Sequence, residues 1–464
     1  MSSSLPERAP IQPTGLRRLL GAVGIDRAIF YTILGRGWGV LAGPITLFFV
    51  ARYLSGEEQG FYYTFSSVLA LQVFFELGLG HVILQFASHE MAHLRWTTEG
   101  TVEGDSAAKI RLASLLQLTF KWYLVAAVAA CVVLAISGLL FFGQYEASGP
   151  PVTWRLPWIL IVVTACAGLL PTPFYGILEG CGRVADIRRM NVRQVVVASV
   201  FCWAAFALHW KLYASGVFII AAQFVSIGWM TMKHRQFFRD LLTVRVPTGA
   251  GLRWRQDILP FQWKITLSWL SGYFIFQLAN PVLFRFHGAV EAGRMGMTMK
   301  IIESITAVAI AWVSTKAAPF GVYVARRDFA LLDRVFWKAS VQSVGVVILG
   351  GLSFLALYYA LRSGGVAFVD RLLAPLPTVL LLGGAVVNCV IFNQALYLRS
   401  HKQEPFLFNS ILGAVMVPAV MYFLGRPFGA LGIAAGLLGA GLLVSLPLAT
   451  LVFYRKRREW HLPA

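Results

Sequence analysis

The feature that most constrains this chain is a series of long apolar runs separated by short charged clusters. The first two runs, about residues 28–52 and 61–87, flank the polar hinge ARYLSGEEQGFYYT at Ala51–Thr64. At about 1.5 Å per helical residue, each run is long enough to cross the ~30 Å hydrocarbon layer of a membrane. Because backbone groups in lipid must be satisfied within their own segment, these runs predict two antiparallel transmembrane helices.

The same pattern continues to the end of the sequence. Of the 464 residues, 58% are hydrophobic and 14% aromatic, which is typical of a polytopic membrane protein. We predict an all-α fold of about 12 transmembrane helices. The predicted spans are approximately 28–52, 61–87, 119–142, 155–178, 190–210, 213–232, 257–284, 293–315, 335–361, 376–398, 406–424 and 430–454.

The distribution of basic residues predicts the orientation. An even number of spans places both termini on one side, and segments on that side carry about 30 of the 40 Lys and Arg residues. Cytoplasmic loops collect Lys and Arg, so we expect a multi-pass membrane protein with cytoplasmic termini. The formal charge of +19 has the same explanation, and we expect no nucleic-acid partner.

Two internal echoes divide the chain into halves. The first places the same residue types at a constant offset of 233: Arg52, Glu58 and Gly60, then Arg285, Glu291 and Gly293. The second pairs ILEGCGRVADIRRMN, ending at Asn191, with ALYLRSHKQEPFLFN, ending at Asn409. Six spans separate each pair, so the pattern predicts two six-helix lobes related as parallel repeats around a central cavity.

The halving point also predicts the domain organisation. The expected units are a cytoplasmic tail at 1–27, an N-lobe at 28–232, a cytoplasmic linker at 233–256, a C-lobe at 257–454 and a basic tail at 455–464.

Charged residues inside the spans are candidates for function, because a charge at mid-membrane costs from about 2.5 kcal/mol upward. Arg36 and Glu76 lie at matching depth on the first two spans, about 14 Å from the cytoplasmic face by helical rise. They could form an ion pair that only fastens the two helices. Alternatively, Arg36 offers its guanidinium to an anionic headgroup, while Glu76 holds it and exchanges a proton. We favour a cavity-facing Arg36.

The C-terminal half contains a second polar group. Lys300 and Glu303 are three residues apart and can neutralise each other on one face of the eighth span. On the seventh span, Tyr273, Gln277 and Asn280 form a polar stripe at i, i+4 and i+7, which predicts a helix facing the cavity.

Several chemistries are not indicated. The five cysteines have no repeated spacing and no nearby histidine cluster, so we expect neither disulfides nor a metal site. There is no Walker loop and no nucleophile with a plausible base. The sequence therefore predicts a protein that is not an enzyme and has no resident cofactor.

The segment ITLFFVARYLSGEEQGFYYTFSSVLALQVFFELGLGHVILQFASHE, within about residues 45–90, resembles the start of the polysaccharide transporter family. These are the Wzx-type O-antigen and lipid-linked oligosaccharide flippases of the MOP (MATE-like) superfamily. The resemblance implies a flippase that moves a polyprenyl-diphosphate-linked glycan across the bacterial inner membrane by alternating access.

This resemblance also implies partners and roles. Partners would be the lipid-linked glycan, membrane lipids and the polysaccharide assembly machinery, and an H⁺ or Na⁺ gradient would drive transport. On this basis Arg36, Arg52, Arg285 and Lys300 are the expected cations of the headgroup path, and Glu76, then Glu303, the expected coupling carboxylates.

Two rival functions stay open. A cation-coupled drug or metabolite antiporter of the same fold would want an acidic cavity, whereas the charges inside these spans are balanced or basic. A membrane glycan polymerase or ligase would usually need a large external loop, and the loops predicted here are short.

Overall fold

The structure, a computed structural model, describes residues 27–145, 151–247, 251–259, 273–401 and 405–461, together with Gln262, Thr266 and Gln403. The predicted all-α membrane fold is confirmed. In the first half the elements are α2 (Arg27–Tyr53), α3 (Gly56–Leu69), η1 (Ala70–Gln72), α4 (Val73–Glu76), α5 (Leu79–Met91), β1 (Leu94–Trp96), β2 (Val102–Gly104), α6 (Ser106–Gly143), α7 (Arg155–Ala167), α8 (Thr172–Gly180), α9 (Val184–Ala207), α10 (Tyr213–Lys233) and α11 (Arg235–Thr243).

The second half is also helical in its described residues. Its elements are η2 (Trp254–Ile258), α13 (Ala279–His287), α14 (Ala289–Ser314), α15 (Ala317–Ala325), α16 (Phe329–Ser363), η3 (Ala367–Arg371), α17 (Pro375–Arg399), α18 (Leu407–Ala440), η4 (Gly441–Ser445) and α19 (Leu446–His461). Much of the predicted seventh span, including Lys264, lies outside the described residues.

Helices in the described residues are long and apolar enough to cross a membrane nine times, or ten if the bent pair α3–α4 and α5 counts as one span. The last of these, Leu407–His461, contains two helices, because Gly429 has a non-helical backbone (φ 59°, ψ −141°). Beyond it the chain folds back, since a Cβ at Gly425 would lie 2.8 Å from Ile433. The predicted separation into spans at 406–424 and 430–454 therefore matches the fold.

The predicted second span is not continuous. Leu77 and Gly78 adopt left-handed conformations (φ 52° and 65°), which end α4 and start α5 with a bend of 42°. Gly78 favours this break because glycine adopts positive φ without steric cost, whereas Leu77 must be held there by its surroundings. The structure thus corrects the expectation of one unbroken helix over residues 61–87.

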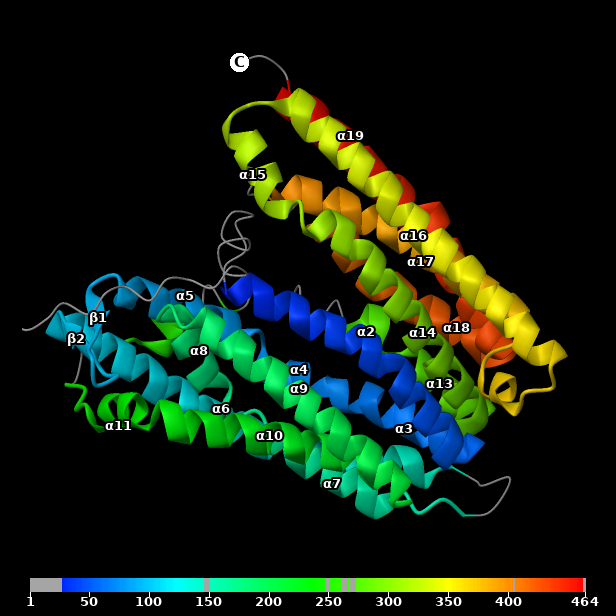
Figure 1. The fold of residues 1–464 in the computed structure, drawn as a ribbon, viewed down its shortest axis with the longest axis horizontal. Helices are drawn as coiled ribbons and strands as arrows, with labels where there is room; N and C mark the ends of the chain where they lie inside the picture. The colour runs from blue at the N-terminus through cyan, green and yellow to red at the C-terminus, as the bar shows by residue number, and fades with distance from the viewer. Residues whose placement is uncertain are drawn as a thin grey trace, which may run out of the picture.

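Two groups of helices, α2–α11 and α13–α19, make up the molecule (Figure 1). They meet where α3 packs against α13 and α14, and they diverge toward α5 on one side and α15 on the other. We call the meeting region, with the α2–α3 and α13–α14 turns, the closed end, and the opposite region the open end. The molecule is therefore a V of two lobes.

The first turn of α3 is fixed by its own sequence. Ser55 is the N-cap: its hydroxyl accepts a hydrogen bond from the Glu58 backbone N–H, and the Glu58 carboxylate accepts one from the Ser55 N–H (2.8 Å). This capping box determines where the helix starts and which face it turns to the other lobe.

Two glycines allow the lobes to touch at the closed end. A Cβ at Gly60 would overlap the carbonyl oxygen of Ala289, and a Cβ at Gly293 would lie 2.8 Å from the Gly60 nitrogen. Gln59, which is buried, donates from Nε2 across the junction to the Gly293 carbonyl (2.8 Å). We call Gln59, Gly60, Ala289 and Gly293 the closing contact; small residues permit such close helix approach.

At the open end of the first lobe, hydrogen bonds and ion pairs connect its helices to one another. Arg111 of α6 binds Glu90 of α5 through Nε (2.9 Å to each carboxylate oxygen), and Lys109 pairs with Asp240 of α11 (2.9 Å). Trp96 of the short β1–β2 hairpin donates to the Cys181 carbonyl (2.8 Å). These bonds stay within the lobe.

The second lobe has an equivalent fastening. Asp333 of α16 accepts hydrogen bonds from Arg457 of α19 (3.1 Å) and from the Tyr397 hydroxyl of α17 (2.7 Å). Tyr397 has thereby donated its only hydroxyl proton, so His461 must donate to it from Nε2 (3.0 Å). Each lobe is thus internally tied, as a rigid body would be.

We predict that Gly60→Ala destabilises the protein by about 1–3 kcal/mol, because an added methyl group collides with backbone that cannot rotate away. The unfolding midpoint of the purified protein in detergent would report the change. Gly39→Ala is the matched control, since a Cβ there meets nothing within 4 Å. Equal midpoints for the two variants would contradict the close approach.

Candidate functional site

Arg36 lies on the face of α2 that is turned toward the second lobe. The nearest atom to a Cβ at Gly43 is Ser304 Oγ of α14, at 3.7 Å, and residues seven apart share a helix face. Arg36 is exposed, and no hydrogen bond or ion pair joins it to another described residue. Its guanidinium is therefore directed between the lobes with its five donors available.

Lys300 is directed into the same space from the opposite lobe. It lies one turn before Ser304, whose hydroxyl donates to the Lys300 carbonyl (2.8 Å), so the two residues share a face of α14. The ammonium binds Glu303 Oε2 at 2.7 Å, which confirms the pairing predicted from their spacing. Both side chains are about half exposed, at 52% and 51%. An exposed pair of this kind contributes little to stability and stays available to other groups.

A small pocket of about 40 Å³ lies beside this ion pair and is lined by residues of both lobes. It brings together four residues that the sequence singled out, and it adds three hydroxyl groups from α3. The lining polar residues are Tyr63, Ser66, Ser67, Gln277, Asn280, Lys300 and Glu303. Asn280 donates to the Ser67 hydroxyl across the lobe boundary (3.3 Å), and its own Oδ1 is buried without a partner among the described residues.

Tyr273 does not share this position. Its side chain is buried, with its ring 5.4 Å from that of Phe74 in an edge-to-face arrangement. The predicted stripe thus divides: Gln277 and Asn280 line the pocket, and Tyr273 packs against the first lobe.

The two cations lie at different depths. Gly43 and Ser304 are level, Arg36 lies seven residues toward the open end on α2, and Lys300 lies four residues toward the closed end on α14. At 1.5 Å per residue, Arg36 and Lys300 are separated by about 16 Å along the helix axes. The site therefore has cationic groups at two depths between the lobes. We call Arg36, Lys300 and the pocket beside Lys300 the track.

Arg36 and Glu76 are not paired. No ion pair joins them in the part of the chain that the structure describes, although both residues are included. The reason is that α2 packs along α9 and α14, whereas α4 packs against α6. Equal depth on consecutive spans does not fix the rotation of either helix about its axis.

Glu76 instead turns into the first lobe. The phenol of Tyr123 on α6 is its polar neighbour, and the buried Tyr123 hydroxyl makes no hydrogen bond to any described residue. Glu76 is the last residue of α4, directly before the break at Leu77, where a helix presents unpaired carbonyl groups. One of these, the Leu77 carbonyl, accepts a hydrogen bond from the Thr266 hydroxyl (2.9 Å).

Arg52 and Arg285 lie at the closed end. Both are exposed, at the end of α2 and near the end of α13, and neither lines the pocket. Their shared offset in the sequence corresponds to the carboxyl-terminal turns of α2 and α13, and their place in the headgroup path stays a prediction.

Sequence reasoning missed Gln59 as a functional candidate. Its Nε2 also donates to the Arg371 carbonyl (3.1 Å), so one amide joins α3 to two segments of the other lobe. The available signal was its position, because Gln59 lies between Glu58 and Gly60 of the repeated hinge. Among the described residues, no group of three or more His, Cys, Asp or Glu side chains could hold a metal ion.

Comparisons with known proteins identify the fold. No family model matches the sequence, and no curated protein matches it. Among solved structures, the chain is similar to the lipid II flippase MurJ in an inward closed conformation, with a TM-score of 0.66 and 10% identity over 93% of this chain and 87% of that one.

Two multidrug transporters are similar as well. An inward-facing MATE family transporter of the MOP superfamily has a TM-score of 0.52 and 14% identity, covering 90% of this chain and 98% of the other. The MATE multidrug transporter DinF-BH has a TM-score of 0.53 and 13% identity, covering 97% of this chain and 98% of the other. The chain therefore has the fold of MOP-superfamily transporters.

We expect Glu76→Gln and Tyr123→Phe to be energetically coupled, because each side chain is the other's polar neighbour. In a double-mutant cycle on the free energy of unfolding, the coupling should be at least ~0.5 kcal/mol. Arg36→Gln combined with Glu76→Gln should be additive within about 0.5 kcal/mol. A larger coupling energy between Arg36 and Glu76 than between Glu76 and Tyr123 would instead support the predicted Arg36–Glu76 ion pair.

Proposed function

We propose that this protein is a flippase that moves a polyprenyl-diphosphate-linked oligosaccharide across the bacterial inner membrane by alternating access. The observation that carries the proposal is the pair of exposed cations, Arg36 and Lys300, on helix faces that the two lobes turn toward each other. The fold shared with MurJ, a lipid II flippase, supports it.

The chemistry of such a substrate fits the track. A diphosphate needs charge-assisted donors, and the planar guanidinium of Arg36 can bind two phosphate oxygens at once. The sugars need hydroxyl and amide partners, which Ser66, Gln277 and Asn280 supply deeper between the lobes. The polyprenyl chain would stay in lipid beside the diverging lobes.

The transport cycle follows from the arrangement of the lobes. With both termini cytoplasmic, the open end faces the cytoplasm and admits the headgroup first to Arg36, then to Lys300. Opening of the closing contact would release the glycan on the other side. Such rocking of two internally fastened lobes is the general behaviour of repeat-based transporters.

The rival function, a cation-coupled antiporter, has support from the MATE transporters of the same fold. Its cationic substrates would need acidic groups between the lobes. The groups identified there are Arg36, Lys300 and Glu303, whose net charge is positive, so an anionic substrate is favoured.

Coupling to an H⁺ or Na⁺ gradient is proposed to run through Glu76. A carboxylate at the carboxyl end of a broken helix lies among carbonyl oxygens, and this negative environment favours a proton or a small cation. The Tyr123 hydroxyl can donate to the charged carboxylate when that cation leaves. Glu303 is the second candidate, with Lys300 as its counter-ion.

Arg36→Ala should stop surface glycan display while the protein stays abundant in the membrane, because the first phosphate contact is lost. Display would be followed by labelling of whole cells in a strain that depends on this chain. The matched control is Arg193→Ala. Arg193 is level with Arg36, because Gly35 of α2 faces Val192 of α9 (3.4 Å). Each arginine follows its contacting residue by one position, so on two parallel helices the side chains point to opposite sides of the helix pair. Normal display with Arg36→Ala would refute the assignment.

Replacing Glu76 with Gln should abolish the dependence of transport on the ion gradient, because an amide takes up neither a proton nor a cation charge. Flipping of fluorescently labelled lipid-linked oligosaccharide in proteoliposomes, with and without an imposed pH or Na⁺ gradient, would measure this. Stimulation by either gradient should be lost in Glu76→Gln and retained in Glu99→Gln, an exposed loop residue. Undiminished stimulation in Glu76→Gln would remove it as the coupling group.

A further inference from the structure

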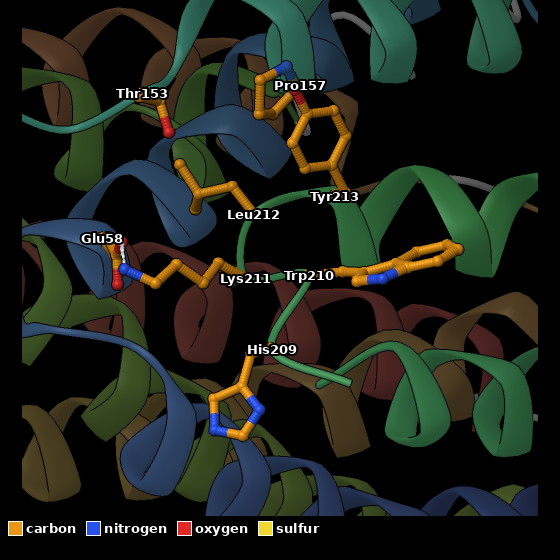
Figure 2. Close-up of a pocket in the computed structure, with 8 residues that line it drawn as sticks. All are labelled: Glu58, Thr153, Pro157, His209, Trp210, Lys211, Leu212 and Tyr213. Carbon is orange, nitrogen blue, oxygen red and sulfur yellow. Dashed lines mark hydrogen bonds and ion pairs between the residues drawn. The ribbon is translucent and has the colours of Figure 1, made fainter. Parts of the chain in front are cut away.

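A second, larger pocket of about 440 Å³ opens at the closed end of the first lobe. Figure 2 shows that it is built around the turn between α9 and α10, with α3 on one side and the start of α7 on the other. Its lining residues are Glu58, Thr153, Pro157, His209, Trp210, Lys211, Leu212 and Tyr213. This volume lies in the range of small-molecule sites.

The charges in this pocket cancel. Lys211 Nζ binds Glu58 Oε1 at 2.8 Å, and the other Glu58 oxygen already accepts the Ser55 N–H. Lys211 is 54% exposed, and an ammonium group has three protons, so two donors stay available to a ligand. Thr153 is exposed, and no hydrogen bond from its hydroxyl to another described residue is present. The pocket thus combines an apolar and aromatic lining with an ion pair whose formal charges cancel.

The turn holds its side chains in an unusual arrangement. His209 and Lys211 both have left-handed backbones (φ 61° and 48°), which is uncommon for residues other than glycine. Trp210, between them, donates its backbone N–H to the Ala205 carbonyl (2.9 Å) and leaves 53% of its surface exposed. In Figure 2 the Trp210 ring and the Lys211 chain extend in opposite directions from the turn, and Tyr213 lies beside Pro157.

We propose that this pocket is a binding site for a neutral saccharide. Sugar rings present flat C–H faces, which pack on aromatic rings such as those of the exposed Trp210 and the half-buried Tyr213. Their edges are rich in hydroxyl groups, which match Lys211, Glu58 and Thr153. A charged ligand would have to break the Glu58–Lys211 pair or leave its own charge unpaired. An aromatic lining with a neutralised ion pair therefore selects a polyhydroxylated, uncharged ring.

The position of the pocket gives the site its role, and this step rests on the proposed function. Glu58 immediately precedes Gln59 and Gly60 of the closing contact, on the same turn of α3. A saccharide bound to Glu58 and Lys211 contacts the segment that must move when the closed end opens. The structure assigns this pocket as a place where the sugar of an emerging glycan is held outside the central track.

Footprinting of individual side chains by hydroxyl radicals and mass spectrometry tests the site in the full-length protein in nanodiscs. The probes are free neutral hexoses and their disaccharides, a uronic acid, an amino sugar and glycerophosphoethanolamine. A neutral saccharide should reduce labelling of His209 and Trp210 several-fold, and Trp210→Ala should abolish the protection of His209. Trp337→Ala, which alters a similarly exposed tryptophan of the other lobe, should retain it.

Three results would overturn the assignment: no protection by any sugar, protection by the charged sugars alone, or equal protection by glycerophosphoethanolamine, which would identify a lipid headgroup site. The outcome is separable from that of the proposed function. If no sugar protects the pocket and Arg36→Ala loses surface glycan display, the saccharide site is refuted and the proposed flippase function is retained. If a neutral sugar protects the pocket and Arg36→Ala displays glycan normally, the saccharide site is retained and the proposed function of the track is refuted.

Discussion

The structure depends on the backbone-to-backbone approach of Gly60 and Gly293 at the closed end. Neither position has room for a methyl group, and Gln59 seals the junction by donating to carbonyl groups of the other lobe. Apolar side chains also pack across this junction, since the rings of Phe61 and Phe284 lie 4.9 Å apart in a buried cluster that both lobes share, so opening the closed end must separate this surface as well. The fastening bonds at the open end lie within each lobe, so the closing contact is where the two bodies would pivot and part.

The same arrangement explains how the chain tolerates charges within its spans. Arg36, Lys300 and Glu303 are exposed on faces that the lobes turn toward each other, so they avoid the full cost of burial in hydrocarbon. Glu76 is accommodated differently. It lies inside the first lobe at a helix break, with Tyr123 as its polar neighbour. We propose the first set for contact with an anionic headgroup and Glu76 for uptake and release of a cation.

The sequence predicted what depends on local spacing and missed what depends on helix rotation. Apolar run lengths predicted the spans, and a spacing of three residues predicted the Lys300–Glu303 pair, since both follow from the geometry of one helix. The Arg36–Glu76 pair failed because depth alone cannot say which neighbour a side chain faces. The echo of Gly60 in Gly293 was correctly interpreted as a repeat, yet it did not reveal that the two copies touch. The break at Leu77 was missed for a similar reason, because a left-handed leucine is imposed by tertiary packing.

The most direct test of the account is a pair of distances measured by double electron–electron resonance in nanodiscs. Spin labels would be placed in a cysteine-replaced background at the exposed residues Leu208 and Val366 of the closed end, and at Ser88 and Arg326 of the open end. On addition of lipid-linked oligosaccharide, the account predicts a new population in which the closed-end distance is longer and the open-end distance shorter. Distances that stay fixed, or that change in the same direction at both ends, would contradict alternation about the closing contact.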